Sequence, residues 1–231
     1  MSDVLLRATG IRKDFEKAKE VIKVLLGVDL DVAQGEMVAI MGRSGAGKST
    51  LLHIMGGLEK PDGGEVFWSG KSVFKMKDGD RTQLRGKTVG FIFQSHHLLP
   101  ELTALENVCM PLLVAHKPWR EVLSRARECL AAVDLADRAE HKPGELSGGE
   151  QQRIAVARAL ALRPPLVLAD EPSGNLDKPT ALLLHELLRS ICCEQGTAFL
   201  IVTHNEELAA VSDRQLVLAA GALEPRILER Q

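Results

Sequence analysis

The chain has 231 residues, of which 45% are hydrophobic and 26% are charged, and its net charge is −2. This composition is typical of a globular protein and provides no overall basic field that would draw the chain to nucleic acid or anionic lipid. No apolar run reaches the length of a membrane span, and the charged N-terminal stretch is unlike a secretory signal. The four cysteines (Cys109, Cys129, Cys192 and Cys193) show no metal-ligand spacing, so free thiols in a reducing cytoplasm are expected.

The first third of the chain favours strands followed by a glycine-rich loop and a helix. Apolar residues alternate from Val28 to Val32, and the apolar run Met37 to Met41 fits a strand that is buried on both faces. A glycine-rich stretch follows, and then a helical segment from Ser49 to Met55, which Gly56 and Gly57 interrupt. Strand, glycine loop and helix in this order open a nucleotide-binding α/β domain.

The middle of the chain is predominantly helical. Two capping boxes predict helix starts, Thr103 with Glu106 and Ser147 with Glu150. Between them Pro118 fits the first turn of a helix, and apolar residues from Val122 to Val133 recur at helical spacing. The helix that begins at the second box is expected to run until Pro164 stops it.

Alternation of strands and helices resumes near the C-terminus. The expected elements are a buried strand over Leu166 to Asp170, a helix over Thr180 to Glu194, a strand over Ala198 to Thr203 and a strand pair around Ala220. The fold prediction is α/β, a single domain over 1–231. Its core comprises 1–94 and 163–231, and 95–162 is a helical insertion.

One motif predicts a phosphate site. The pattern G-x-x-x-x-G-K-[ST] and the residue after it cover Gly42, Arg43, Ser44, Gly45, Ala46, Gly47, Lys48, Ser49 and Thr50. Glycines let the backbone N–H groups curl around phosphate oxygens at the positive end of a helix. Lys48 can reach the β- and γ-phosphates, and Ser49 can ligate Mg²⁺. A chance glycine loop is the alternative, and the strand before and helix after the motif weigh against it.

Two acidic residues end the predicted strand over Leu166 to Asp170. Asp170 can hold Mg²⁺ through water, and Glu171 beside it can act as general base on the attacking water. The alternative is a solvated acidic loop, which the glycine motif upstream makes less favourable.

A second anion-binding surface is predicted far from the first in sequence. The segment Leu146 to Arg153, LSGGEQQR, is a capped helix start with a serine hydroxyl and free N–H groups. Taken alone, it could equally be an ordinary helix cap.

With these motifs in this order, the chain resembles the nucleotide-binding subunits of ABC transporters over essentially its whole length. The resemblance implies a P-loop NTPase core of ABC-ATPase type with an inserted helical subdomain, an antiparallel β part near the N-terminus, ATP as the nucleotide and Mg²⁺ as the metal. It further implies that two copies face head to tail. Ser147, Gly148 and Gly149 of one copy would then contact the nucleotide in the P-loop of the other.

Further roles follow from the same resemblance. Gln94 would be the glutamine that senses Mg²⁺ and the γ-phosphate, and His204 the histidine that steadies the γ-phosphate in the transition state. Asp177 would communicate across the dimer, and Phe15 would stack on adenine. The family more often has tyrosine at that position, and phenylalanine keeps the aromatic face. Asn205 stands where the family often has aspartate, which puts the local hydrogen bonding in doubt.

The segment from Phe93 to Leu113 resembles the Lol-type lipoprotein-releasing ATPases of Gram-negative bacteria. This implies a peripheral protein on the cytoplasmic face of the inner membrane, with integral permease subunits docking in a groove near Gln94 to Leu113. His96 and His97 would line that groove, and a metal site there is disfavoured because no further ligands are nearby. A related macrolide-exporter-like or cell-division system is the alternative.

Other classes fit the sequence less well. DNA-repair and chromosome-organising ATPases separate the two phosphate motifs by long coiled coils, whereas sustained heptads are absent here. Translation-associated ABC factors carry two cassettes in one chain. A P-loop module that only binds nucleotide would not need Glu171. No nucleic-acid partner is expected.

Overall fold

The computed structural model describes residues 4–17 and 20–226. In its first half the elements are β1 (Val4–Lys17), β2 (Glu20–Ala33), β3 (Met37–Met41), α1 (Lys48–Met55), β4 (Gly63–Trp68), β5 (Lys71–Ser72), α2 (Asp78–Thr88), β6 (Val89–Ile92) and α3 (Ala104–Val114). In its second half they are α4 (Trp119–Ala131), α5 (Gly148–Leu160), β7 (Leu166–Asp170), α6 (Lys178–Gln195), β8 (Ala198–Thr203), α7 (Glu206–Ala210), β9 (Arg214–Ala219) and β10 (Ala222–Pro225), with two 3₁₀ turns at Ala136–Arg138 and Pro143–Glu145. No helix of the described residues is long and apolar enough to cross a bilayer.

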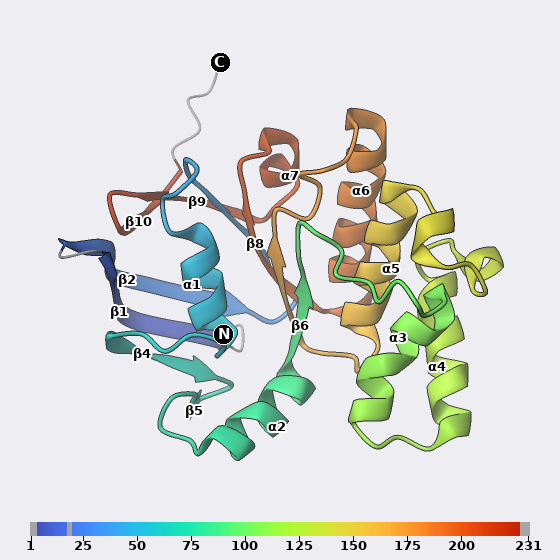
Figure 1. The fold of residues 1–231 in the computed structure, drawn as a ribbon. Helices are drawn as coiled ribbons and strands as arrows, with labels where there is room; N and C mark the ends of the chain where they lie inside the picture. Colours follow the sequence, from blue (N-terminus) through green and yellow to red (C-terminus); the bar gives the residue numbers. More distant parts are fainter. Residues whose placement is uncertain (1–3, 18–19, 227–231) are drawn as a thin grey trace.

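The strands form two sheets (Figure 1). One is antiparallel with the order β2-β1-β4-β5, and the other has the order β10-β9-β3-β8-β7-β6. Strands β6, β7, β8, β3 and β9 run parallel to one another, and only β10 is antiparallel. Because the parallel strands share a direction, their carboxyl ends meet at one edge, where α/β folds bind ligands.

The parallel sheet is buried on both faces. Leu166 and Leu168 of β7 face a core that includes α1 and the antiparallel sheet. Val167 and Ala169 of the same strand face a second core built from α3, α4, α5 and α6. Successive side chains of a strand point to opposite faces, so a strand covered on both sides must be apolar throughout. This confirms the interpretation of the apolar runs as buried strands.

Helices α3, α4 and α5 follow β6 in the chain and gather beyond that edge strand, to the right in Figure 1. Both predicted capping boxes are present. The Thr103 hydroxyl accepts from the Glu106 N–H at 3.2 Å, and the Glu106 carboxylate accepts from the Thr103 N–H at 2.8 Å. The helical insertion predicted for this part of the chain contains all three helices, and its boundaries at 95 and 162 remain a prediction.

Several predicted boundaries were wrong by a few residues. The helix after the glycine motif begins at Lys48, because its first turn forms directly on the left-handed Gly47. Helix α5 ends at Leu160, before Pro164, and α6 extends over Lys178–Gln195. Val133 lies beyond the end of α4, although it is buried in the same core.

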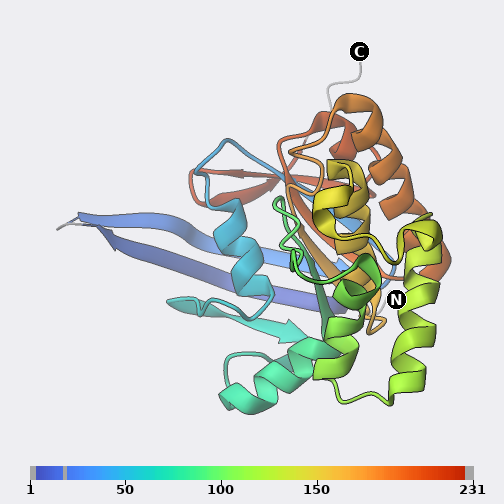
Figure 2. The same cartoon turned by 45° about the vertical axis from the view of Figure 1, so that its right-hand side comes forward.

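Several elements went unpredicted in extent or existence, among them α2 and the hairpin of β1 and β2. Helix α2 has one buried residue, Thr88, and therefore no apolar periodicity to reveal it. The hairpin of β1 and β2 is far longer than the expected strand from Val28 to Val32, and Figure 2 shows it projecting from the body of the molecule.

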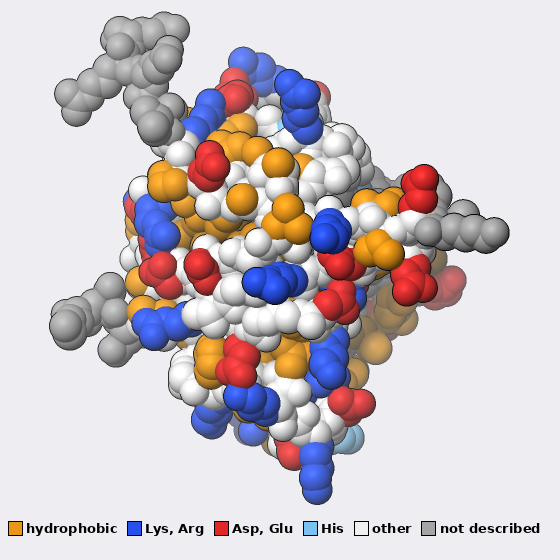
Figure 3. Space-filling view, turned by 90° about the vertical axis from the view of Figure 1, so that its left-hand side faces the viewer, with side chains coloured by type: hydrophobic (Ala, Val, Ile, Leu, Met, Phe, Trp, Pro, Cys, Tyr) orange, Lys and Arg blue, Asp and Glu red, His pale blue; other side chains and the backbone are white. Residues whose placement is uncertain are grey.

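Figure 3 shows the left-hand face of Figure 1, where cationic and anionic side chains are interspersed. All four cysteines are free thiols, and only Cys193 is exposed.

Candidate functional site

The glycine-rich loop between β3 and α1 is shaped by residues that admit no side chain. Gly45 and Gly47 have φ values of 79° and 96°, in the left-handed region that favours glycine. A Cβ on Gly47 would lie 2.5 Å from Val24 Cγ1, and one on Gly42 would lie 2.7 Å from the carbonyl oxygen of Leu218. The loop therefore follows a close path between neighbouring segments and ends at the N-terminus of α1.

Lys48 is folded back over this loop. Its ammonium group donates to the carbonyl oxygens of Gly42 at 2.8 Å and Arg43 at 3.3 Å, and its side chain is 9% exposed. It also lies 3.7 Å from the Glu171 carboxylate. A buried ammonium ion needs such partners because desolvation is costly. An incoming anion could replace these partners.

Glu171 follows β7 in a left-handed backbone conformation, with φ of 44°. Its N–H donates to the carbonyl oxygen of Val202, which ties it to the neighbouring strand β8. Its carboxylate accepts from the Thr203 hydroxyl at 2.9 Å and from the N–H of His204 at 3.1 Å, and lies 2.9 Å from His204 Nδ1. The structure thus brings the predicted base and the predicted histidine into direct contact.

Gln94 lies two residues beyond the end of β6 and is joined to the segment after Glu171. Its side-chain N–H donates to Asn175 Oδ1 at 3.1 Å, and Asn175 Nδ2 donates back to the Gln94 carbonyl oxygen at 3.1 Å. A Cβ on Gly174 would lie 3.0 Å from Gln94 Nε2, so glycine permits this close approach. Nothing in the sequence had singled out Asn175.

These groups line one open cleft of about 790 Å³. Its lining residues are Phe15, Val24, Gly42, Arg43, Ser44, Gly45, Gly47, Lys48, Ser49, Thr50, Gln94, Asp170, Glu171 and His204. Among the predicted site residues, Ala46, Ser147, Gly148, Gly149 and Asp177 are not part of its lining. Four of the lining segments follow the carboxyl ends of the parallel strands β3, β6, β7 and β8, and the hairpin of β1 and β2 adds Phe15 and Val24.

Phe15 stands at the outer end of the cleft on β1. Its side chain is 39% exposed, and the Lys13 ammonium group lies 5.3 Å from the ring centroid. Val24 of β2 lines the same end of the cleft and was not predicted. The only signal for Val24 would have been the pairing of β1 with β2, which a local pattern does not reveal.

The helix start over Ser147 to Gly149 lies outside this cleft. The Ser147 hydroxyl accepts from the Glu150 N–H at 3.3 Å, and the Glu150 carboxylate accepts from the Ser147 N–H at 2.8 Å. These bonds from Ser147, with a contribution from Arg138, lower the pKa of Glu150 to about 2. A Cβ on Gly149 would overlap the Thr180 side chain, so glycine lets α5 pack closely against α6.

Sequence relatives of this chain identify its family. The family model described as ABC transporter matches residues 25–174. The chain is 51% identical to the lipoprotein-releasing system ATP-binding protein LolD 2 of Caulobacter vibrioides, over 97% of this chain and 98% of that protein. It is 50% identical to LolD of Myxococcus xanthus, over 94% and 97%. The chain belongs to the ABC transporter family.

Solved ABC structures agree with this assignment. The ATP-binding cassette MJ0796, in a dimeric post-hydrolysis state bound to ADP and phosphate, superposes with a TM-score of 0.87 at 39% identity, over 96% of this chain and 98% of that one. Another dimeric structure of the same cassette gives 0.88 at 41% identity, over 95% and 97%. The chain is thus an ABC ATPase that binds nucleotide, which confirms the predicted fold class and enzyme class.

Asp177 of this ABC chain is exposed at the start of α6. Its carbonyl oxygen accepts from the Ala181 N–H at 2.9 Å, while its side chain makes no capping hydrogen bond. Asn205, where the family often has aspartate, caps α7 by accepting from the Leu208 N–H at 2.9 Å. The local hydrogen bonding that this substitution had put in doubt is therefore complete.

A buried pair behind the ABC cleft was also missed. His185 on α6 is 1% exposed, and its Nε2 lies 2.9 Å from the hydroxyl of Ser173, which is 4% exposed. Burial lowers the pKa of His185, so the ring is neutral near pH 7. Ser173 lies within the turn closed by the hydrogen bond from the Gly174 N–H to the Glu171 carbonyl oxygen. His185 therefore braces the turn that holds Glu171.

Proposed function

We propose that this chain is the ATP-hydrolysing subunit of an ABC complex that releases lipoproteins from the bacterial inner membrane. The observation that carries the proposal is the 51% identity to LolD 2 over 97% of the chain. In this reading the subunit is peripheral, on the cytoplasmic face of the inner membrane. It consists of the α/β core over 1–94 and 163–231 and the helical part over 95–162, and it binds no nucleic acid.

ATP binds along the cleft from Phe15 to the glycine loop. The adenine stacks on the exposed ring of Phe15, with Val24 beside it. The phosphates lie against the N–H groups of residues 42–50, at the N-terminus of α1, where anions are stabilised. Lys48 exchanges its carbonyl partners for the β- and γ-phosphates, which satisfy the same ammonium protons with a stronger charge-assisted bond.

The residues near the γ-phosphate suit Mg²⁺. Ser49, Asp170 and Gln94 offer hydroxyl, carboxylate and amide oxygen atoms, and all three line the cleft. Mg²⁺ prefers oxygen ligands and keeps several waters, so one carboxylate acting through water is sufficient. The ion, when bound, neutralises charge on the phosphates. The side chains of Ser49 and Gln94 then hold the γ-phosphate at a fixed distance from Glu171.

Glu171 acts as the general base for the attacking water, and His204 holds the γ-phosphate. The carboxylate of Glu171 is held by the Thr203 hydroxyl and by the N–H of His204. Both donors bond to Oε2 and so orient the carboxylate. The other oxygen atom, Oε1, faces His204 Nδ1 and the Lys48 ammonium group, and it can accept a proton from water once these two side chains turn to the phosphates. His204 Nδ1 now lies at Glu171, and its side chain is 69% exposed. It is free to turn toward the γ-phosphate once substrate is bound.

The second copy of the chain completes each site. Ser147, Gly148 and Gly149 lie outside the cleft, so they can contact a γ-phosphate only if it is bound by another molecule. In a head-to-tail dimer the start of α5 from one copy closes over the cleft of the other. Asp177, exposed near this helix start, then lies at the interface between the copies.

Permease subunits dock near Gln94 to Leu113. A hollow of about 310 Å³ lies there beside edge strand β6, and its lining includes Phe93, Pro111 and Leu162. His96 and His97 belong to the segment beside it, and Arg158 of α5 holds both of their carbonyl oxygens, at 2.7 and 2.6 Å. Helix α5 thus connects the residues that meet the partner's nucleotide with the wall of the permease hollow.

A trapped complex tests the proposal. Tagged Glu171→Gln protein is expressed in its native host, supplied with Mg-ATP and purified from gently solubilised membranes, because this substitution retains ATP while stalling hydrolysis. Recovery of a permease with few spans and a large periplasmic domain, together with lipoproteins, is expected. An efflux or cell-division partner would favour the alternative system, and a soluble chain that recovers nucleic acid would contradict a transporter role.

A further inference from the structure

A second large hollow lies between α4 and the turn that follows α5. Its volume is about 620 Å³, and we call it the basic groove. Its charged lining consists of the cations Lys117, Arg120, Arg125 and Arg163 and the carboxylates Glu121 and Glu128. The charged lining therefore carries two more positive than negative groups, unlike the mixed surface of Figure 3.

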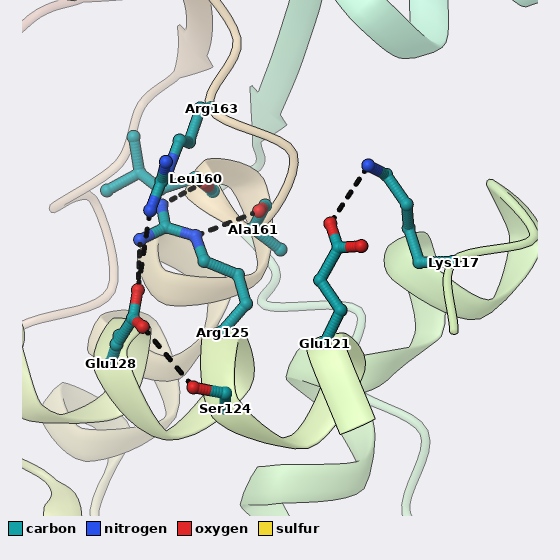
Figure 4. Close-up of polar contacts among 8 residues, drawn as sticks. All are labelled: Lys117, Glu121, Ser124, Arg125, Glu128, Leu160, Ala161 and Arg163. Carbon is teal, nitrogen blue, oxygen red and sulfur yellow. Dashed lines mark hydrogen bonds and ion pairs between the residues drawn. The ribbon is translucent and has the colours of Figure 1, made fainter. Parts of the chain in front are cut away.

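Arg125 joins the two sides of the basic groove by connecting α4 to the end of α5. Its guanidinium group donates to the carbonyl oxygens of Ala161 at 3.1 Å and Leu160 at 3.0 Å, at the C-terminal end of α5. Its third contact is with the Glu128 carboxylate at 3.2 Å, and Arg163 lies 3.5 Å from the same carboxylate (Figure 4). Two guanidinium groups thus already converge on one carboxylate of the chain itself.

The remaining cations are available for a ligand. Lys117 pairs with Glu121 in an exposed contact at 2.9 Å, the kind of ion pair that contributes little and exchanges readily. Arg120 is exposed and has no ion pair within the part of the chain that the structure describes. The Arg163 side chain is 73% exposed. A carboxylate entering the groove would meet these donors while the hydrogen bonds of Arg125 to the end of α5 stay intact.

The basic groove and the permease hollow share one lining residue. Leu162 lines both of them, and Arg125 and Arg163 also line a third hollow on the other side of the turn. Two exposed apolar side chains flank the connection between α3 and α4, Val114 at the end of α3 with 72% exposure and Trp119 at the start of α4 with 59%. Exposed aromatic and apolar groups beside an exposed arginine, here Arg120, are typical of interaction surfaces.

We propose that the basic groove binds an acidic segment of the permease, adjacent to the part of the permease that occupies the hollow beside β6. This inference rests on the proposed function. Excess positive charge selects Asp and Glu side chains, since guanidinium groups pair with carboxylates in a planar, bidentate geometry. The partly exposed Leu162 in the lining accommodates apolar parts of a peptide. The segment fixes the permease in one register on this subunit and accelerates docking through electrostatic attraction.

Charge reversal of the exposed arginines tests this inference. Inner-membrane vesicles of the native host, stripped of peripheral proteins with urea, are titrated with purified chain at several salt concentrations. The double variant Arg120→Glu, Arg163→Glu should bind at least tenfold more weakly, and its binding should lose most of its salt dependence. Arg127→Glu is the matched control, because Arg127 is exposed on the same helix and does not line the groove.

Additional measurements separate this inference from the proposed function. Both variants should keep the ATPase rate of the isolated chain, which shows that they fold and dimerise. A photo-crosslinker in place of Ser124 should label a permease peptide rich in Asp or Glu. Unchanged binding of the double variant, labelling of a neutral peptide or of lipid, or equal binding to protein-free phosphatidylglycerol vesicles would overturn the acidic-segment proposal. Failure of the unmodified chain to bind the stripped vesicles would overturn the permease partnership as a whole.

Discussion

The two phosphate-binding surfaces of this chain differ in how complete they are. The cleft contains two cations (Arg43 and Lys48), two carboxylates, a histidine and a glutamine within one hollow, and Lys48 and Glu171 already contact each other. The start of α5 offers a hydroxyl and N–H groups, and the carboxylate of its first turn, Glu150, is bonded to Ser147 itself. The cleft can bind nucleotide and hold the reacting groups alone, whereas the start of α5 is useful only to another molecule.

The difference explains why a chain that contains both phosphate motifs still needs a second copy to complete a site. In the proposed head-to-tail dimer, residues that act on the same phosphate are separated across two copies, so binding of ATP and association of the copies become one event. Each site of a symmetric dimer then uses both surfaces, so a substitution in either surface impairs both sites.

Mixing two inactive variants gives the strongest test of whether the cleft and the start of α5 act together across two copies. Lys48→Ala removes the buried ammonium group of the cleft, and Ser147→Asp keeps a good helix cap while adding a negative charge that repels phosphate. Each variant alone should lose at least about a hundredfold in ATPase rate. An equimolar mixture forms mixed dimers that have one intact composite site, and should recover about a quarter of the normal rate. No recovery would mean that each chain hydrolyses ATP by itself.

The outer end of the cleft can be altered while the start of α5 is left unchanged. Phe15→Ala should raise the KM for ATP about tenfold, because stacking of a base on an aromatic ring is worth about 1–3 kcal/mol. Phe15→Tyr keeps the ring and should leave KM near its normal value. Steady-state ATPase assays measure both, and an unchanged KM for Phe15→Ala would remove this residue from the adenine site.

The two capping boxes provide an internal control for the helix starts. Thr103→Ala and Ser147→Ala should each lower the free energy of unfolding by about 1 kcal/mol, since each removes the same kind of N-cap bond. Only Ser147→Ala should also lower the ATPase rate, because only that helix start meets nucleotide. Urea denaturation and ATPase assays on both proteins test this. Equal losses of rate would mean that Ser147 acts through stability alone.

The smallest expected effect concerns the support behind the cleft. Burial lowers the pKa of His185 below its ordinary value of 6.5. When the pH falls below about 6.5, the unfolded chain therefore takes up a proton at this ring that the folded chain does not. The free energy of unfolding should decrease over this range, and His185→Leu should reduce the slope. Denaturation midpoints between pH 7.5 and pH 5.5 measure it, and identical slopes for both proteins would contradict this assignment.

The sequence predicted the elements whose signals are local. Both capping boxes, the glycine loop and the buried strands could be inferred because the residues that define them are close in the chain. Asn175, Val24 and the pair of His185 with Ser173 were missed, because each acts through a partner brought near by folding. Helix α2 was missed for a different reason, since a polar helix on the surface leaves no apolar stripe.

The placement of the two tryptophans has a spectroscopic consequence. The chain has no tyrosine and two tryptophans, so its intrinsic emission arises from these two rings. Trp68 is 1% exposed and donates to the Met55 carbonyl oxygen, which shields it from events at the surface. Trp119, the first residue of α4, is 59% exposed. When the two tryptophans are excited at 295 nm, the change in emission on binding therefore comes mainly from Trp119. Binding of a partner at the start of α4 can be followed by this fluorescence without any label.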